Sequence, residues 1–395
     1  MKYDSNYPDL IVLGSTGSVG EQAVDVARAH SIPLRAVTAH RSVTTVEAQI
    51  REFHPDFAVM TDETAASDLR ARVADTSTRV LAGFEGITEV LHTVKTHNPL
   101  GITAENSILG EAGLLPTLET LKAGHKLALA NKESLVVGGE LVMSLAKEKG
   151  TTILPVDSEH CAIFQCLRAG HHDEISRILL TASGGPFYGY TGEQLQSVTK
   201  SMTLAHPTWK MGAKITVDSA TLMNKGFEVI EAVHLFGVAP EKVEVIVHRE
   251  SMIHSMVEYI DHSIIAQMSV PDMRHCVQYA LTHPRRLPAE GTLRQADLFA
   301  LGKLTFGRPD TDVFPLLALA RDCIARGGAL PCVLNAANEI VVAAFLREEI
   351  RFCEIAELVT RTVEELAYTA ALHTYDELME TDKASRETAR RLIGC

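Results

Sequence analysis

Short apolar runs alternate with helical patterns of apolar residues through the first third of the chain. Parallel strands need a crossover between them, usually a helix, so this alternation is typical of a parallel sheet covered by helices. The pattern predicts an α/β fold that begins with a Rossmann-like domain over residues 1–156. The strands that it predicts are Leu10 to Leu13, Leu34 to Thr38, Phe57 to Met60, Arg79 to Leu81, Lys126 to Leu129 and Thr152 to Leu154.

The pattern changes after residue 157, where strand candidates become closely spaced and extra helices lie between them. This predicts a central α+β domain over residues 157–287, followed by a linker rich in proline and glycine over residues 288–310. Helical spacing then continues to the end, which predicts a C-terminal helical bundle over residues 311–395. The central strands are expected at Ile178 to Thr181, Val243 to Val247, Met252 to Tyr259 and Ile264 to Met268, and the last helices at 313–325, 332–347, 353–369 and 375–392.

Composition narrows the class of protein. The 395 residues are 46% hydrophobic and 22% charged, as expected of a globular protein, and the formal net charge is −13. Such a charge disfavours a general nucleic-acid or anionic-membrane surface, so neither partner is expected. The seven cysteines include no C-x-x-C pair, and the N-terminus shows no signal-peptide pattern. We therefore expect a cytoplasmic protein with reduced thiols.

A glycine-rich turn, Gly14-Ser15-Thr16-Gly17-Ser18-Val19-Gly20, follows the first predicted strand and opens a helix. Glycines let the backbone approach a pyrophosphate, which the N–H groups at the helix start then bind. Two residues rather than one separate the first two glycines, so a purely structural turn is the alternative. The context favours a dinucleotide site.

The end of the second predicted strand indicates which dinucleotide is bound. An NAD site usually has an acidic residue there, for the ribose 2′-hydroxyl. Here the sequence is Thr38-Ala39-His40-Arg41-Ser42, and the first acid is Glu47. Arg41 and Ser42 could hold a 2′-phosphate, which favours NADPH; a solvated loop arginine is the alternative.

Two acids, Asp157 and Glu159, follow the apolar run that ends at Leu154. If the strand continued, its period of two would point both carboxylates to one side. Two hard oxygen ligands suit Mg²⁺ or Mn²⁺. The alternative is a helix start, in which Ser158 caps a helix from Cys161 to Leu167 and the acids stabilise its first turn.

Three further polar stretches are candidates for substrate contacts. Asn131-Lys132-Glu133-Ser134 follows a predicted strand, and a long loop at about 184–213 has the features of a lid. Downstream, Asn224 and Glu228 share a helix face with Lys225 beside them, in a helix expected to run from Asp218 through Phe236. That face suits a phosphate group and a third carboxylate.

These motifs, taken in order, resemble the 1-deoxy-D-xylulose 5-phosphate reductoisomerase family. The resemblance runs from Ile11 to about Arg286 and more loosely through the helical tail. It implies an NADPH-dependent, divalent-metal enzyme, usually a homodimer, that makes 2-C-methyl-D-erythritol 4-phosphate for the non-mevalonate isoprenoid route. The matching motifs are Gly14 to Gly20, Ala130 to Ser134, Pro155 to His160, Ser183 to Phe187, His206 to Gly212, Asp218 to Glu228 and His254 to Val257.

The resemblance also implies roles for individual residues. Asp157, Glu159 and Glu228 would bind the metal and, with Lys132, would form the catalytic group. The sugar phosphate would be bound by Ser158, Glu159, Ser183, His206, Trp209, Ser219, Asn224, Lys225 and Glu228, with Met211 also in the lid. NADPH would be bound by Thr16, Gly17, Ser18, Val19, Arg41, Ser42, Asn131, Lys132, Glu133 and Gly212.

Three places depart from the family pattern. His40-Arg41-Ser42 stands where Gly-Lys-Asn is frequent, Glu111 where a small residue is common, and His248-Arg249-Glu250-Ser251 where His-Pro-Gln-Ser is more frequent. Two other functions stay open on the sequence. One is a semialdehyde or acyl-phosphate dehydrogenase with Cys161 as nucleophile, and the other is a nucleotide-binding module without catalysis.

Overall fold

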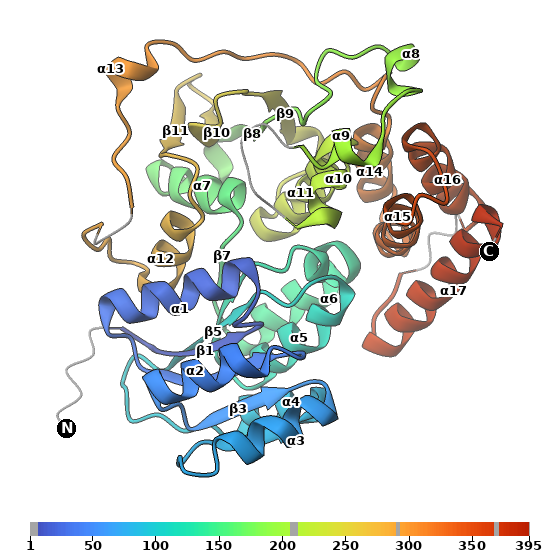
Figure 1. Cartoon of the computed structure of the whole chain (residues 1–395). Coiled ribbons are helices and arrows are strands. Elements are labelled where there is room, and N and C mark those ends of the chain that lie inside the picture. Colours follow the sequence, from blue (N-terminus) through green and yellow to red (C-terminus); the bar gives the residue numbers. More distant parts are fainter. Residues whose placement is uncertain (1–6, 206–211, 290–292, 367–370, 395) are drawn as a thin grey trace. The chain divides into compact units, whose positions relative to one another are not determined.

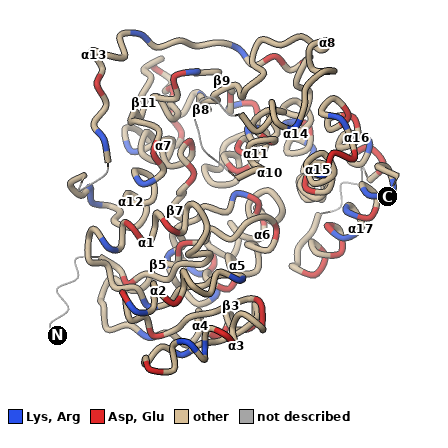
Figure 2. The backbone as a smooth tube through the Cα atoms, in the orientation of Figure 1, with Lys and Arg blue, Asp and Glu red and all other residues tan. Residues whose placement is uncertain are grey.

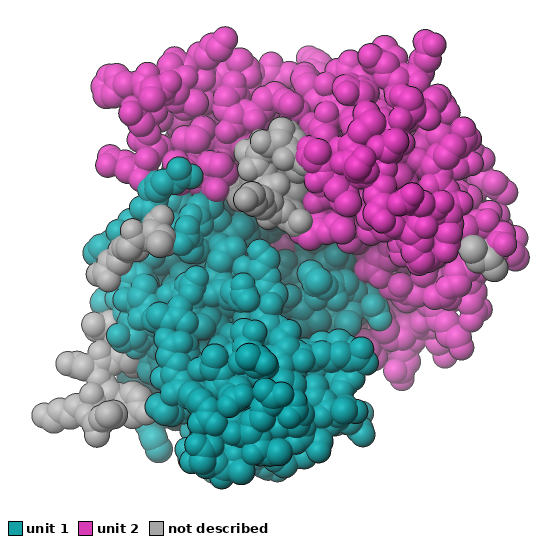
Figure 3. Space-filling model, in the orientation of Figure 1, with its two compact units in different colours: residues 1–134, 142–161, 272–294 teal, residues 135–141, 162–271, 295–395 magenta. Residues whose placement is uncertain are grey.

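The structure is a computed structural model that describes residues 7–205, 212–289, 293–366 and 371–394 (Figure 1). The chain forms two compact units, coloured separately in Figure 3. Unit 1 comprises residues 1–134, 142–161 and 272–294, and unit 2 comprises residues 135–141, 162–271 and 295–395. This grouping differs from the three predicted domains, whose functional boundaries stay a prediction.

Unit 1 contains a seven-stranded sheet in the order β4-β3-β2-β1-β5-β6-β7. Every neighbouring pair of strands is parallel, which confirms the Rossmann-like prediction. The order reverses at β1, between β2 and β5, and ligands of such sheets bind at the carboxyl ends of strands near this point. The strands are β1 (Asp9–Leu13), β2 (Leu34–Ala39), β3 (Phe57–Met60), β4 (Arg79–Ala82), β5 (Ile102–Asn106), β6 (Lys126–Leu129) and β7 (Ile153–Pro155).

Helices cover this sheet. On one face, Ile11 and Ala104 of adjacent strands pack against Ile87, Val90 and Leu91. α1 also contacts α12, which the chain contributes from far downstream. The helices are α1 (Ser18–His30), α2 (Val43–Phe53), α3 (Glu63–Arg72), α4 (Gly83–Thr93), α5 (Leu114–Lys122) and α12 (Arg274–Thr282); α6 (Glu133–Lys149) and α7 (Ser158–Cys166) have residues in both units.

Unit 2 contains a four-stranded mixed sheet in the order β11-β10-β8-β9. β10 is antiparallel to both of its neighbours, and β8 is parallel to β9. This confirms the predicted α+β region, and the last four helices confirm the predicted helical tail. The elements are β8 (Ile175–Ala182), β9 (Val243–Val247), β10 (Ile253–Tyr259), β11 (Ile264–Met268), α8 (Gly192–Leu195), α9 (Lys200–Thr203), α10 (Ala213–Ala220), α11 (Met223–Phe236), α13 (Leu298–Leu301), α14 (Leu316–Arg326), α15 (Leu330–Leu346), α16 (Phe352–Glu365) and α17 (Tyr375–Ile393).

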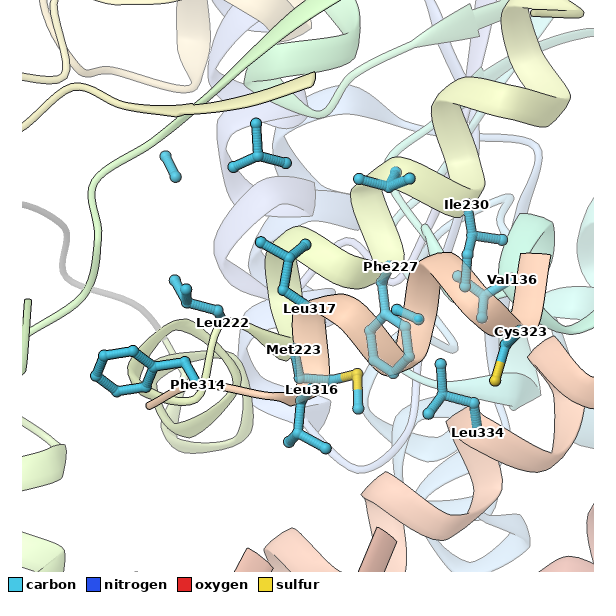
Figure 4. Close-up of a cluster of buried hydrophobic side chains, with 14 of the residues drawn as sticks. Val136, Leu222, Met223, Phe227, Ile230, Phe314, Leu316, Leu317, Cys323 and Leu334 are labelled. Carbon is cyan, nitrogen blue, oxygen red and sulfur yellow. The ribbon is translucent and has the colours of Figure 1, made fainter. Parts of the chain in front are cut away.

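The core of unit 2 lies around α11, α14 and α15 (Figure 4). Phe227 and Ile230 of α11 are buried in one hydrophobic cluster with Leu317 and Leu334. A Cβ at Gly226 would lie 2.6 Å from Ala320 Cβ. The glycine inside α11 is therefore needed for close packing of α11 on α14, rather than for approach of a ligand.

The single helix predicted from Asp218 to Phe236 is wrong, because the chain breaks it at Leu222. That residue has φ +61°, in the left-handed region, and separates α10 from α11. Its side chain is buried in the core of unit 2, which offsets the cost of a conformation that non-glycine residues rarely adopt. The break lets α11 start afresh just before Asn224.

Charged residues of both signs are spread along the helices (Figure 2). Many form surface pairs one helical turn apart, such as Arg72 with Asp68 at 2.9 Å. Such exposed pairs contribute little stability. The negative net charge is therefore spread over the helices. Binding of an anionic ligand must rely on individual Lys and Arg side chains and on backbone N–H groups. Of the helices that the structure describes, none is both long enough and apolar enough to cross a membrane.

Candidate active site

The β1–α1 turn has the backbone geometry of a dinucleotide-binding loop. Gly14 has φ +90°, and a Cβ there would lie 3.1 Å from the backbone of Ser107. A Cβ at Gly20 would lie 2.1 Å from the Gly14 carbonyl oxygen, so the start of α1 packs directly on the turn. Gly17, the N-cap residue, lacks a side chain that could occupy the N–H groups at the helix start. These groups suit a phosphate.

Hydrogen bonds fix this turn to its neighbours. Ser15 Oγ donates to Gln49 Oε1 at 2.7 Å, and Gln49 Nε2 donates back to the Ser15 carbonyl at 3.0 Å. The Gly14 N–H donates to Thr38 Oγ1 at 3.0 Å. The sequence analysis gave neither Gln49 nor Thr38 a role in this turn, since a single polar residue in a helix or strand does not reveal its partner.

Arg41 lies just beyond the carboxyl end of β2, where the 2′-phosphate was predicted to bind. Its Nε donates to Asp62 Oδ2 at 2.7 Å, and 72% of its side chain is exposed. Ser42 is the N-cap residue of α2. Asp62 also accepts from the Ala65 N–H as the cap of α3, so it anchors the guanidinium to a fixed point. Arg41 thus presents an accessible positive charge.

Asn131 organises the carboxyl end of β6. Its amide nitrogen donates to the carbonyls of Ile108 and Gly110 at 2.7 and 2.8 Å, and its oxygen accepts from the Ser134 N–H at 2.9 Å. A Cβ at Gly113 would lie 2.5 Å from the Asn131 side chain. The predicted cofactor residues Asn131 and Glu133 therefore lie in a tightly packed junction that begins α6.

Lys132 joins this junction to β7. Its side chain is buried, and its Nζ lies 2.6 Å from Asp157 Oδ2. Desolvation acts against the charged carboxyl, but the Lys132 ammonium and His160 prevail and lower the Asp157 pKa. His160, 3.7 Å from the same carboxylate through Nδ1, was named in the motif but given no role. Its fully buried ring supports Asp157.

Asp157 and Glu159 do not extend the strand, so the reasoning from a period of two is wrong. β7 ends at Pro155, and α7 begins at Ser158. Asp157 precedes the helix: its Oδ1 accepts from the Ser158 N–H at 3.0 Å and its carbonyl accepts from the Cys161 N–H at 2.8 Å. Ser158 is therefore not the cap, and its hydroxyl donates to Glu159 instead.

The two carboxylates still meet at this junction. A carboxylate oxygen of Asp157 and a carboxylate oxygen of Glu159 lie within 4.8 Å of each other. Paired carboxylate oxygens are the donor set that Mg²⁺ and Mn²⁺ prefer, so the junction suits part of a divalent-metal site. Glu228, the third predicted ligand, belongs to unit 2.

Glu228 is buried on α11, where it accepts hydrogen bonds from Asn224 Nδ2 and Lys225 Nζ. The three side chains therefore form one polar group on the helix, as the spacing predicts. Lys225 is itself buried, so its ammonium depends on this carboxylate.

The predicted phosphate residues Ser183 and Ser219 lie near each other in unit 2. Ser183 follows β8, and its hydroxyl accepts from the Gly185 N–H at 3.3 Å. A Cβ at Gly185 would lie 2.6 Å from the Ser219 carbonyl oxygen, so this turn packs on the end of α10. Gly212 is the N-cap residue of α10. His206, Trp209 and Met211 lie outside the described residues.

The structure does not support the alternative function in which Cys161 is the nucleophile of a dehydrogenase. Cys161 is 1% exposed, so its thiol is not presented to a substrate. It shares a hydrogen bond with the thiol of Cys276, and that contact and burial raise the pKa of Cys276. Thiols in such surroundings are inert.

Comparisons with known proteins cover nearly the whole chain. A model described as 1-deoxy-D-xylulose 5-phosphate reductoisomerase matches residues 10–139, and two models of C-terminal domains of that enzyme match residues 153–236 and 268–388. The reductoisomerase of Bacteroides fragilis is 45% identical over 386 residues, covering 97% of both chains. That of Caldanaerobacter subterraneus is 47% identical over 384 residues, covering 97% of this chain and 98% of the relative.

Solved structures give the same result. The Zymomonas mobilis reductoisomerase in complex with NADPH has a TM-score of 0.90 at 40% identity, covering 98% of this chain and 99% of that chain. A reductoisomerase in complex with NADPH, fosmidomycin and magnesium has a TM-score of 0.89 at 37% identity, covering 98% of both chains. Identity of this extent, over almost the full length, leaves one assignment: the chain belongs to the 1-deoxy-D-xylulose 5-phosphate reductoisomerase family.

Proposed function

We propose that this protein converts 1-deoxy-D-xylulose 5-phosphate to 2-C-methyl-D-erythritol 4-phosphate, using NADPH and a divalent metal ion, in non-mevalonate isoprenoid biosynthesis. The observation that carries the proposal is the junction of Lys132, Asp157 and Glu159 at the carboxyl ends of β6 and β7. It lies on a dinucleotide-type sheet, in a member of a family with this activity.

NADPH is bound along the carboxyl edge of the unit 1 sheet. The N–H groups of Thr16, Gly17, Ser18 and Val19 at the start of α1 hold the pyrophosphate, and Arg41 with Ser42 holds the 2′-phosphate. Asn131, Lys132 and Glu133 line the nicotinamide end, together with Gly212 of the lid. Arg41 supports the choice of NADPH because its guanidinium is exposed and anchored by Asp62.

Asp157, Glu159 and Glu228 hold the divalent ion, which is Mg²⁺ or Mn²⁺. The bound ion supplies Lewis acidity to the substrate carbonyl and the adjacent hydroxyl. Lys132 keeps Asp157 ionised and orients a substrate hydroxyl, and Ser158 contacts the substrate backbone. These fixed groups stabilise the charge that develops on oxygen while the carbon skeleton rearranges.

The phosphate end of the substrate is bound by Ser183, Ser219, Asn224 and Lys225 in unit 2, with His206 and Trp209 in the lid. Binding energy from this group, remote from the reacting carbons, orients the substrate and closes the lid. Closure retains the aldehyde intermediate until the nicotinamide hydride reduces it.

The protein acts as a homodimer in the cytoplasm. β11 is an edge strand, and its Ile264, Ile265 and Met268 are 50%, 38% and 36% exposed. An apolar edge of this kind is a template for pairing with a second copy. The buried cysteines that the structure describes form no disulfide, as in a reducing compartment.

NADPH oxidation by the purified protein tests the function directly. We expect oxidation that requires both 1-deoxy-D-xylulose 5-phosphate and Mg²⁺ or Mn²⁺, and that stops when EDTA is added. Oxidation that EDTA leaves unchanged would refute the metal dependence. If the substrate causes no oxidation with either ion, the proposed function is wrong.

A further inference from the structure

Arg249 is a charged residue to which the proposed function gives no role. It follows β9 in the stretch His248-Arg249-Glu250-Ser251. The His248 N–H donates to the Ala182 carbonyl at 2.8 Å, so this stretch lies beside the end of β8. Ser183, a proposed phosphate ligand, is the next residue after Ala182. Arg249 is therefore adjacent to the phosphate end of the proposed site.

The guanidinium of Arg249 binds the turn that contains Ser183. Its Nη1 donates to the Ser183 carbonyl at 3.1 Å and to the Gly185 carbonyl at 2.7 Å. The guanidinium also lies over the Tyr188 ring, 5.4 Å from the centroid. One planar cation thus joins both ends of the turn and rests on an aromatic platform from the same loop.

This turn needs an external restraint. Gly184 and Gly185 have φ values of +78° and +67°, and glycine samples many other conformations. In a trans peptide the N–H points away from the preceding C=O. Since the Ser183 carbonyl faces Arg249, the Gly184 N–H is directed to the opposite side. Arg249 thereby sets the direction of an anion donor beside the Ser183 hydroxyl.

The residues around Arg249 are themselves fixed. Glu250 accepts from the Thr305 N–H at 3.3 Å and from its hydroxyl at 2.6 Å. His248 contacts the Thr305 carbonyl through Nδ1 at 2.9 Å, and its ring stacks on Phe306. Glu250 Oε2 also lies 3.0 Å from His248 Nδ1, so its carboxylate is engaged by residues on both sides. These contacts attach the residues on either side of Arg249 to Thr305 and Phe306.

We infer that Arg249 is a positioning residue for the anionic end of the substrate. It holds the Ser183-Gly184-Gly185 turn in the phosphate-binding conformation and adds a positive charge behind it. The inference rests on the proposed function, and it concerns binding of the phosphate rather than the chemical step. It predicts that loss of the guanidinium weakens the affinity for phosphate-bearing ligands and leaves turnover at saturation intact.

Steady-state kinetics of Arg249→Gln test the inference. We expect KM for 1-deoxy-D-xylulose 5-phosphate to rise about tenfold, because removing a charged hydrogen-bonding group typically costs on the order of 1.5 kcal/mol. The kcat and the KM for NADPH should stay within twofold of the parent values. Inorganic phosphate, used as a competitive inhibitor, should lose affinity by a similar factor. The KM of Arg249→Lys should lie between those of the parent and Arg249→Gln. An ammonium keeps the charge but cannot bridge both carbonyls with one planar group.

Arg326→Gln is the matched control, because it removes one positive charge from an exposed helical pair of unit 2. It should leave every constant unchanged. A KM in Arg249→Gln equal to that of the control overturns the inference, and so does a fall in kcat with unchanged KM. If Arg249→Gln is insoluble, an unchanged KM in Arg249→Lys overturns it as well. A parent protein without activity refutes the proposed function instead.

Discussion

Lys132 Nζ lies 2.6 Å from Asp157 Oδ2, and the two side chains are only 9% and 14% exposed. This ion pair joins the carboxyl ends of the adjacent strands β6 and β7. It keeps Asp157 ionised in a buried place, as its lowered pKa shows. A carboxylate held in this way is ready to bind a cation without first losing a proton.

Asp157→Asn should abolish nearly all turnover, by more than about a hundredfold, while NADPH still binds. The amide is a poorer metal ligand, and it leaves the buried Lys132 without its counter-charge. NADPH oxidation with added Mg²⁺ measures the first effect, and fluorescence titration of NADPH measures the second. Asp173→Asn, which changes an exposed acid, is the control. Near-normal turnover in Asp157→Asn would contradict the proposed metal site.

Lys225→Ala should raise KM for the sugar phosphate at least tenfold. The side chain is buried beside Glu228 and Asn224, so its loss removes a positive charge from the proposed phosphate group and from beside the buried Glu228 carboxylate. The loss of this positive charge beside a buried carboxylate should also lower the melting temperature, which a thermal unfolding experiment measures. Lys383→Ala on the exposed face of α17 provides the comparison. If KM does not change, Lys225 does not bind the phosphate.

The alternation of apolar runs was sufficient to predict most strands of unit 1, because buried parallel strands are apolar throughout. β5 was not predicted, since Thr103, Glu105 and Asn106 are polar although they are buried. Only the fold shows that these residues lie inside a sheet. A polar residue in a strand gives no sign of its burial in the sequence.

The sequence was sufficient to predict those site residues that belong to a motif. It was not sufficient to predict the local backbone geometry of these residues. The acids near β7 were expected on a strand, with a helix start as the alternative, and Asp157 directly precedes the helix that begins at Ser158. The break at Leu222 was equally hidden, since tertiary packing of that side chain determines it. Arg249 stands out in the sequence only as a departure from the family pattern, and its contacts with the Ser183 turn depend on the pairing of β8 with β9.

Arg41→Ala should reduce kcat/KM for NADPH by about tenfold to a hundredfold and leave that for NADH nearly unchanged. A guanidinium that binds a 2′-phosphate contributes a charge-assisted bond that NADH cannot form. Kinetics with both nucleotides measure the change in preference. Arg72→Ala removes an arginine from a comparable exposed pair on α3 and should have no effect. An equal loss with both nucleotides would assign Arg41 a structural role only.

Glu105 makes the stability of unit 1 depend on pH. Its carboxyl is buried, and burial raises the pKa of Glu105 to about 8. Ser107 Oγ lies 3.1 Å from Glu105 Oε2 and 3.1 Å from the Leu13 carbonyl oxygen. Ser107 donates to Glu105, which acts to lower the carboxyl pKa, but burial of Glu105 has the larger effect and raises it. The folded protein therefore favours the neutral carboxyl.

Between about pH 4.5 and pH 8 the unfolded chain has released this proton and the folded chain has kept it. The contribution of Glu105 to stability is therefore present at low pH and is lost as the pH rises toward 8, by about 1.4 kcal/mol for each pH unit. Glu105→Gln keeps an acceptor oxygen for Ser107 but cannot ionise. In urea unfolding at pH 6, 7 and 8, the variant should gain stability over the parent with each step. Glu85→Gln changes an exposed acid on α4, and its stability should change with pH as that of the parent does. Parallel pH profiles for the parent and Glu105→Gln would show that Glu105 is ionised in the folded protein.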